Sequence, residues 1–131
     1  MILVDSSVWI DYFNGSQTPQ ADWLDSALGH TPIIIGDLIL TEVLQGFQSD
    51  KDFKTAKDLL LSIPFLPMGG QDIALESAIN YRLLRKKGVT VRKTIDVMIG
   101  TFCIHCHLPL LHDDRDFDPM VKFLGLETIN L

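Results

Sequence analysis

Short aliphatic runs alternate along the chain with segments whose apolar residues recur every three or four positions. A short run without polar positions indicates a buried strand of a parallel sheet, and the three-to-four spacing indicates an amphipathic helix. We predict strands in residues 1–4, 33–35, 65–68, 109–112 and 126–129. We predict helices in residues 8–13, 18–28, 37–47, 49–60, 71–86 and 95–104, with a short helix after Pro119.

Strands and helices therefore alternate from one end of the sequence to the other. This order predicts a three-layer α/β/α sandwich with a mostly parallel central sheet. The chain has 131 residues, of which 47% are hydrophobic, and this is enough material for one substantial core. We find no internal repeat, linker or low-complexity segment, so we expect a single domain over residues 1–131.

Capping residues set several of the expected boundaries. Thr18 followed by Pro19 is typical of a helix start, and Ser49 is expected to begin another helix. Asp118, directly before Pro119, is expected to be an N-cap. Pro67 cannot donate a ladder hydrogen bond, which favours an edge position for the strand at 65–68.

Acidic residues interrupt apolar sequence at four places. Asp5 follows the first predicted strand, Glu42 and Asp96 lie within apolar helices, and Asp114 with Asp116 follows the strand at 109–112. In open α/β sheets the carboxyl ends of the strands form the crevice in which ligands bind. We therefore expect these side chains to converge there.

Converging carboxylates need a compensating charge. Two of them at about 4 Å repel by about 4 kcal/mol at an effective dielectric constant of ~20. A divalent cation removes this repulsion, and an all-oxygen ligand set favours Mg²⁺ or Mn²⁺ over zinc. The sequence thus indicates a carboxylate metal site.

Each acid also has a purely structural interpretation. Asp5 can accept hydrogen bonds from the turn that follows it, and Asp96 lies near a helix start, where a negative charge is favourable. Glu42 can belong to a solvated helix face. These interpretations remain open for each residue alone, but coincidence explains the whole set poorly.

The net charge is −6, which argues against a protein that holds nucleic acid by overall charge. The bases are nevertheless concentrated, since six of the eleven fall between residues 82 and 93. This segment is a candidate for contact with a nucleic-acid backbone. It can equally be the solvated end of a helix.

Cys103 and Cys106 lie in one short segment that also matches a haem attachment pattern and contains a CxxC pair. Haem attachment requires export, and a structural zinc site needs ligands from a second segment. The N-terminus lacks a basic leader, and no apolar run is long enough to cross a bilayer. We expect buried free thiols in a cytoplasmic protein.

Four motifs together resemble a PIN-domain ribonuclease, and specifically a VapC-type toxin. They are DSSVWIDYF with Asp5, ILTEVLQG with Glu42, TIDVMIGTFC with Asp96, and LLHDDRDFDPM with Asp114 and Asp116. The resemblance covers nearly the whole chain, in order and in length. It implies that Asp5, Glu42, Asp96 and Asp114 bind the metal, with Asp116 as an accessory ligand and with Ser7 and Thr94 orienting the cluster.

By this resemblance the protein is expected to be a Mg²⁺-dependent endoribonuclease, with Mn²⁺ as a substitute, that cleaves RNA through a metal-activated water. The products implied are 5′-phosphate and 3′-hydroxyl ends. Candidate RNA contacts are Arg82, Arg85, Lys86, Arg92 and Lys93. The resemblance also implies a cognate VapB-type antitoxin and a homodimer, for which the apolar helices near Trp23 and Phe53 offer faces.

Two other classes of protein share some of these features. A receiver-like signalling domain is also a small acidic Mg²⁺ binder, but it has an acidic pair after its first strand, where this chain offers Asp5 alone, and a lysine after its fifth, which is absent beyond Leu124. A protein-binding module would use its acids only as helix caps. A stability series in Mg²⁺ distinguishes that module from an enzyme.

Overall fold

The computed structural model describes all residues, 1–131, and its centre is a four-stranded sheet. The strands are β1 (Ile2–Val4), β2 (Ile33–Gly36), β3 (Phe65–Leu66) and β4 (Leu110–Leu111), in the order β3-β2-β1-β4. All three neighbouring pairs are parallel. Strand β1 lies between β2 and β4, and its Leu3 is opposite Ile34 of β2 and Leu110 of β4.

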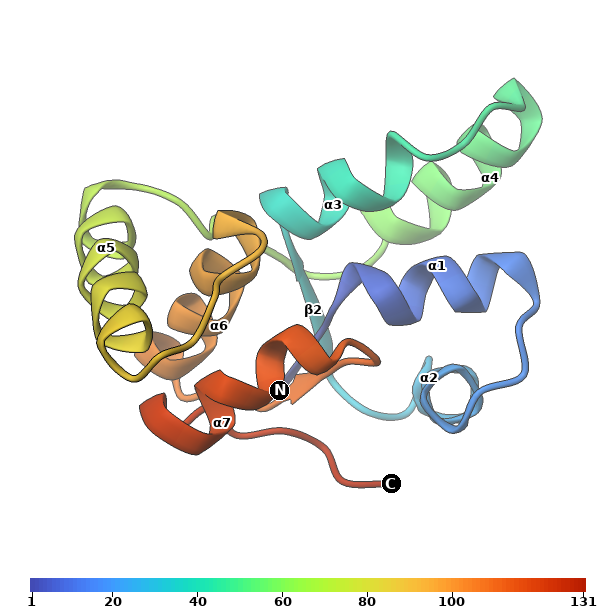
Figure 1. Ribbon diagram of the computed structural model, residues 1–131. Helices are drawn as coiled ribbons and strands as arrows, with labels where there is room; N and C mark the ends of the chain where they lie inside the picture. Colours follow the sequence, from blue (N-terminus) through green and yellow to red (C-terminus); the bar gives the residue numbers. More distant parts are fainter.

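Helices cover both sides of this sheet. They are α1 (Ser6–Asn14), α2 (Pro19–Ala27), α3 (Asp37–Leu44), α4 (Asp50–Leu61), α5 (Gln71–Lys86), α6 (Thr94–Cys106) and α7 (Asp118–Leu124). Figure 1 shows α5 and α6 side by side on one side of the strands, with α1 and α2 on the other. The predicted three-layer α/β/α arrangement with a parallel sheet is confirmed.

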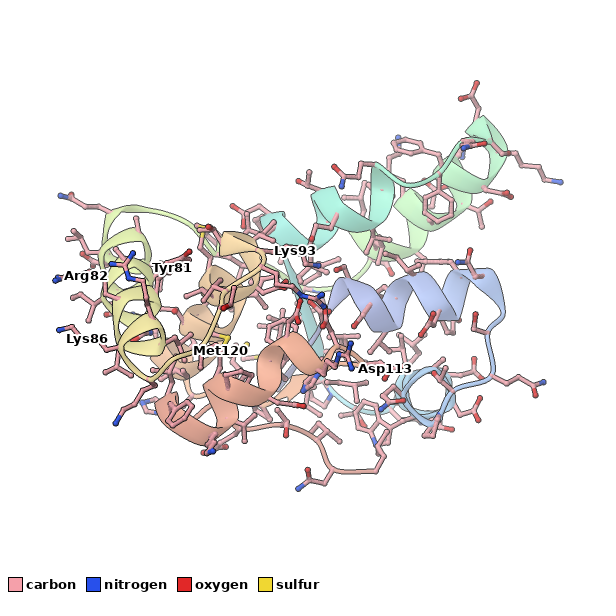
Figure 2. The ribbon with its side chains drawn as sticks, viewed as in Figure 1. Tyr81, Arg82, Lys86, Lys93, Asp113 and Met120 are labelled. Carbon is pink, nitrogen blue, oxygen red and sulfur yellow. The ribbon has the colours of Figure 1, made fainter.

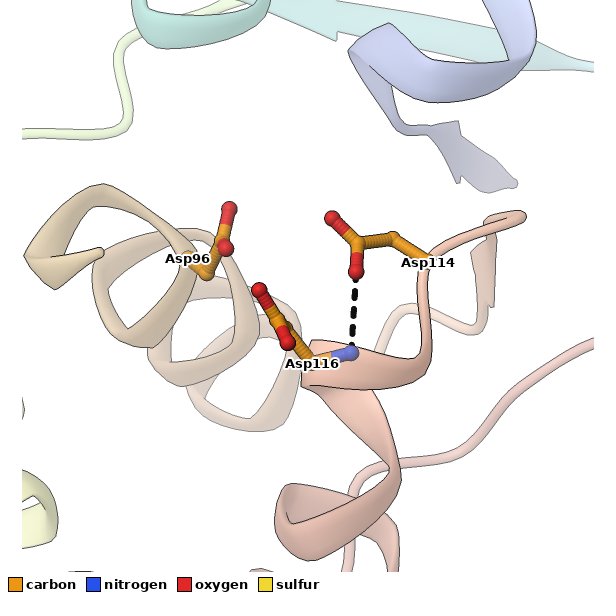
Figure 3. A group of neighbouring side chains, drawn as sticks. All are labelled: Asp96, Asp114 and Asp116. Atoms are coloured by element: carbon orange, nitrogen blue, oxygen red, sulfur yellow. Dashed lines mark hydrogen bonds between the residues drawn. The ribbon is translucent and has the colours of Figure 1, made fainter. Parts of the chain in front are cut away.

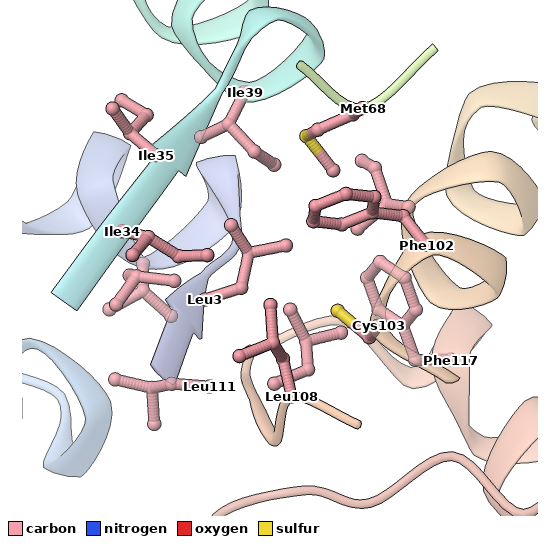
Figure 4. Packing of buried hydrophobic residues seen from close by; sticks show 14 of the residues in the cluster. Leu3, Ile34, Ile35, Ile39, Met68, Phe102, Cys103, Leu108, Leu111 and Phe117 are labelled. Atoms are coloured by element: carbon pink, nitrogen blue, oxygen red, sulfur yellow. The ribbon is translucent and has the colours of Figure 1, made fainter. Parts of the chain in front are cut away.

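The hydrophobic core fixes where the strands end. Twenty-five buried hydrophobic residues form one cluster, and Figure 4 shows Leu3 and Ile34 of the sheet packed toward Phe102 of α6. Because β1 is completely buried from Leu3 onward, the residue after it, Asp5, is buried as well. The carboxyl ends of β1 and β4 are thus held together in the interior.

Two of the expected helix starts are confirmed by their hydrogen bonds. The Thr18 hydroxyl accepts from the N–H of Ala21 at 3.0 Å, and the Ser49 hydroxyl accepts from the N–H of Asp52 at 3.2 Å. The strand predicted at residues 65–68 is shorter in the structure, where only Phe65–Leu66 form β3. It lies at the edge of the sheet, as expected from Pro67.

Two other boundary predictions are wrong. Residues 126–129 form only one bridge, between Thr128 and Leu110, because β4 offers just two residues for pairing. Asp118 is not an N-cap. A 3-10 turn at Arg115–Phe117 precedes it, so Asp118 already has helical dihedrals and Phe117 holds the capping position.

The cysteines are free, as expected, but only Cys103 is buried. Cys106 is exposed because it ends α6 on the solvent side, so the expectation that both are buried is wrong. No helix has both the length and the apolar character needed to span a bilayer.

Candidate metal centre

Asp5 links the first strand to the first helix. Asp5 is 3% exposed. Its Oδ2 accepts hydrogen bonds from the Ser7 N–H at 3.1 Å and from the Ser7 hydroxyl at 2.6 Å, so Asp5 caps the N-terminus of α1. Its Oδ1 is buried and has no hydrogen-bond partner. The capping interpretation is therefore correct for one oxygen of Asp5, while the other oxygen remains free for a ligand.

The Ser7 hydroxyl also joins two loops. While it donates to Asp5, it accepts from the backbone N–H of Asp113 at 3.1 Å. Asp113 lies in the loop that follows β4, immediately before Asp114. Ser7 thus holds the loop after β4 against the carboxyl end of β1.

Three aspartates form a compact group at this place. One carboxylate oxygen each from Asp96, Asp114 and Asp116 lie within 4.8 Å of one another (Figure 3). Asp96 comes from the first turn of α6, and the other two come from the segment after β4. The Oδ1 of Asp114 accepts from the Asp116 N–H at 2.9 Å and so caps the 3-10 turn.

Glu42 lies beside this trio on α3. Its side chain is partly buried, and its Oε1 accepts a hydrogen bond from the Ser6 hydroxyl at 3.1 Å. The sequence interpretation did not include Ser6 in the site. The signal was present in the pair of serines after β1, where the first hydroxyl holds Glu42 and the second holds Asp5.

Two bases face the acids. The Lys93 Nζ lies 3.6 Å from Oδ2 of Asp96 and 3.8 Å from Oδ2 of Asp114. Arg92 contacts Oδ1 of Asp116 through Nε at 3.3 Å and through Nη2 at 3.2 Å.

Burial and mutual repulsion perturb the acids. Burial raises the pKa of Asp96 to about 6, and the charges of Asp5, Asp114 and Glu42 add to this rise against the opposing effect of Lys93. Burial likewise raises the pKa of Asp5 and of Glu42, although hydrogen bonds from Ser7 and Ser6 oppose the rise. Such perturbed groups are typical of functional sites.

The same carboxylates also perturb the pKa of Lys93. Burial lowers the pKa of its ammonium, but the nearby carboxylates, Asp96 foremost, outweigh burial and raise it. All of the four expected metal ligands therefore interact electrostatically in one place.

The remaining candidates lie elsewhere. Thr94 is exposed, makes no side-chain hydrogen bond, and lines a groove between α5 and α6 together with Arg82 and Arg85. Lys86 is exposed at the end of α5, and Figure 2 shows Arg82 and Lys86 on the outer side of that helix, away from Lys93. Of the five expected RNA contacts, only Arg92 and Lys93 touch the acids.

The residues present fit a hard divalent cation. All of the acidic side chains offer oxygen, and two of those oxygens, Oδ1 of Asp5 and Oδ2 of Asp96, are buried without any hydrogen bond. Buried carboxylate oxygens without partners are costly, and a metal ion is the ligand that satisfies several at once.

Comparison with known proteins gives consistent results. A family model described as the PIN domain matches residues 2–122. The chain is 29% identical over 130 residues to Ribonuclease VapC11 of Mycobacterium tuberculosis and to VapC ribonuclease Mb1587 of Mycobacterium bovis, covering 98% of this chain and 97% of each relative.

Solved structures agree in fold. VapBC2 from Rickettsia felis, bound to a promoter DNA fragment, superposes with a TM-score of 0.78 at 15% identity, over 100% of this chain and 99% of that one. VapC20 of Mycobacterium tuberculosis, described as a toxin that cleaves the Sarcin-Ricin loop, gives a TM-score of 0.70 at 15% identity, over 97% of this chain and 99% of the other.

Proposed function

Because this chain belongs to the PIN-domain family, we propose that it is a metal-dependent endoribonuclease and the toxin of a type II toxin–antitoxin system. Similarity over almost the full length to proteins named VapC ribonucleases supports this assignment. The observation that carries it is the acidic centre, in which two buried carboxylate oxygens accept no hydrogen bond. We further propose that residues 1–131 act as one nuclease domain.

We assign Asp5, Glu42, Asp96 and Asp114 as the metal-binding acids, with Asp116 as an accessory ligand. Their convergence at the carboxyl ends of β1 and β4 supports this assignment. Ser7 orients Asp5 through its 2.6 Å hydrogen bond. The assignment of Thr94 as an orienting residue rests on the family resemblance alone.

The ligand set favours Mg²⁺, with Mn²⁺ as a substitute, because both prefer carboxylate and water oxygens. When bound, such an ion polarises a phosphodiester and lowers the pKa of a water that attacks it. The protein's part is to hold the carboxylates in place, which it does through Ser6, Ser7 and the packed ends of the strands. No histidine side chain is hydrogen-bonded to these carboxylates. His112 is close to them, but its Nδ1 accepts from the backbone N–H of Asp114.

We propose that RNA lies across the mouth of this centre. Arg92 and Lys93 are beside the acids and are more than half exposed, so they can reach backbone phosphates near the scissile bond. Three bases on α5 would contact the RNA farther from the scissile bond: Arg82, Arg85 and Lys86. Phosphate contacts of this kind give sequence-tolerant binding that weakens with salt.

The proposed partners are a VapB-type antitoxin and a second copy of the chain, in the cytoplasm. Several structures of similar fold are VapBC complexes, and this supports the antitoxin proposal. The PIN match argues against the receiver-like alternative. An antitoxin that presents an arginine to the carboxylates would block the site by charge pairing.

The test is cleavage of bulk cellular RNA by the wild type and by Asp96→Asn, each in Mg²⁺, Mn²⁺ and EDTA. We expect discrete cuts by the wild type in either metal, and none in EDTA or with the variant. Equal cutting by both proteins would contradict the assignment, since the activity would then come from a contaminant or another site.

A further inference from the structure

Lys93 is placed between two elements of the acidic centre. It immediately precedes α6, and its ammonium reaches Asp96 on that helix and Asp114 in the loop after β4, both at less than 4 Å. In Figure 2 it lies in the middle of the molecule, in contrast with the bases on the outside of α5.

The ammonium faces one oxygen each of Asp96 and Asp114, and neither of these oxygens accepts a hydrogen bond. Oδ2 of Asp96 is buried without a hydrogen bond, and Asp114 uses its Oδ1 to accept from the Asp116 N–H, which leaves its Oδ2 toward Lys93. These are carboxylates that a divalent cation would use. A lysine and a metal ion compete for them, because two cations at such distances repel.

Lys93 is also free to leave. Its side chain is 52% exposed, and its flexible stem allows the ammonium to move into solvent without any loss of core packing. Arg92 likewise forms an ion pair with Asp116, and its side chain is 63% exposed. Both bases thus have the exposure that a displaceable counter-ion requires, whereas Asp96 is buried.

We propose that Lys93 is an internal counter-ion that a divalent cation displaces from Asp96 and Asp114, and that the released ammonium then binds the RNA backbone. The inference rests on the proposed function, since it concerns the metal and the RNA of that same site. It makes the contact between Lys93 and RNA conditional on metal binding. A lysine that only supplied fixed surface charge would not behave in this way.

Calorimetric titration with Mn²⁺ alone tests the first half. We expect Lys93→Met to bind Mn²⁺ about three- to ten-fold more tightly than the wild type, because a half-exposed ion pair no longer competes. Lys93→Arg should stay close to the wild type. Lys51→Met, which removes one positive charge from the exposed face of α4, is the matched control and should leave the affinity unchanged.

A second measurement follows the wild-type side chain itself. After reductive ¹³C-methylation of the lysines, the Lys93 signal, assigned by its absence in Lys93→Arg, should shift in NMR spectra along the binding curve of Mg²⁺, which is diamagnetic. At saturating Mn²⁺, the KM for RNA should rise in Lys93→Met although its metal affinity has improved. Opposite changes in metal affinity and KM are the signature of a displaced counter-ion.

The outcomes separate the two proposals. If the wild type binds Mn²⁺ but Lys93→Met binds it equally or more weakly, or if KM is unchanged, the role of Lys93 is overturned and the nuclease assignment stands. If the wild type binds no Mn²⁺ at all, the metal centre itself is absent and both proposals fail.

Discussion

Asp96 shows how burial and charge conflict at a single residue. It is 5% exposed, its Oδ2 has no hydrogen bond, and its pKa is raised to about 6 from a model-compound value of 3.8. Because the folded pKa lies above the unfolded one, the protonated form stabilises the fold. This contribution is complete below pH 4 and is lost as the pH rises through 6.

We therefore expect Asp96→Asn to stabilise the metal-free protein at neutral pH but not at pH 4. The gain is up to about 3 kcal/mol, since each pKa unit corresponds to about 1.4 kcal/mol. Urea unfolding in EDTA across pH 4 to 7.5 measures this difference. In Mg²⁺ the wild type should gain stability that the variant does not gain.

Asp25→Asn on the exposed side of α2 is the control and should show no such pH-dependent gain. A pH-independent effect of Asp96→Asn, or destabilisation with the Mg²⁺ response intact, would favour a capping role for Asp96 over metal binding.

Ser7 is the second residue whose role can be isolated. Ser7→Ala removes the 2.6 Å hydrogen bond to Asp5 and leaves the Asp113 N–H without its acceptor. We expect a loss of about 1–3 kcal/mol in the free energy of unfolding and a loss of about 10- to 100-fold in Mg²⁺ affinity. Calorimetry and urea unfolding measure both quantities.

The matched variant is Ser26→Ala, whose hydroxyl donates only to the Asp22 carbonyl on the exposed face of α2. It should leave both quantities nearly unchanged. If Ser7→Ala lowers stability but not metal affinity, then Ser7 holds the loops together without orienting a ligand.

The convergence of the acids could be predicted from the sequence, but not all of their hydrogen-bond partners could. Asp5 and Asp114 were predictable because a carboxylate after a buried strand has a fixed place in a parallel sheet. Ser6 was missed because its partner, Glu42, lies 36 residues away and on another element. Long-range hydrogen bonds leave no periodic signal along the chain, and the position of Lys93 between α6 and the loop after β4 was hidden for the same reason.

At the scale of elements, the junction of β2 and α3 depends on a close approach. A Cβ on Gly36 would lie 2.1 Å from Cγ of Met68 and 3.0 Å from the Leu66 carbonyl oxygen. Met68 is completely buried and Leu66 belongs to β3, so neither atom has free space to retreat. The glycine is what lets β3 and the following loop pack against the start of α3.

Gly36→Ala should therefore cost about 1–3 kcal/mol of stability through overpacking. Gly69→Ala is the comparison, because nothing lies within 4 Å of its Cβ and its φ is not positive. Thermal unfolding of the two variants side by side tests this. Equal melting temperatures would show that Met68 repacks freely.

Helices were easier to predict than strands, because nine to sixteen residues of spacing define α1, α2, α5 and α6, and a capping side chain also marks the start of α1 and α2. The strands are two to four residues long, and their ends depend on the pairing partner. The segment 126–129 reads as a strand locally, yet it finds only one partner residue on β4.

The exposed surface of the whole molecule offers two candidate faces for the proposed homodimer. We predicted faces near Trp23 and Phe53, but α5 also carries a stripe of exposed apolar side chains, with Leu75 at 58%, Ile79 at 61% and Leu83 at 37%. Phe53 is 37% exposed, and Trp23 is half-buried and packs against the core.

We expect Ile79→Asp to weaken self-association at least ten-fold, because it places a charge in the middle of the stripe. Phe53→Asp is the competing variant and tests the face first predicted. Sedimentation velocity over a range of concentrations distinguishes them. If only Phe53→Asp weakened self-association, the interface would lie on α4 rather than on α5.

The central claim is that carboxylates hold a metal that activates water against RNA, and the chemistry of the product ends tests it most directly. Fragments from the Mg²⁺-dependent reaction should carry 5′-phosphate and 3′-hydroxyl ends, detected by ligation and by mass spectrometry. Ends with 2′,3′-cyclic phosphate would mean that the RNA's own 2′-hydroxyl is the nucleophile, and would contradict the account.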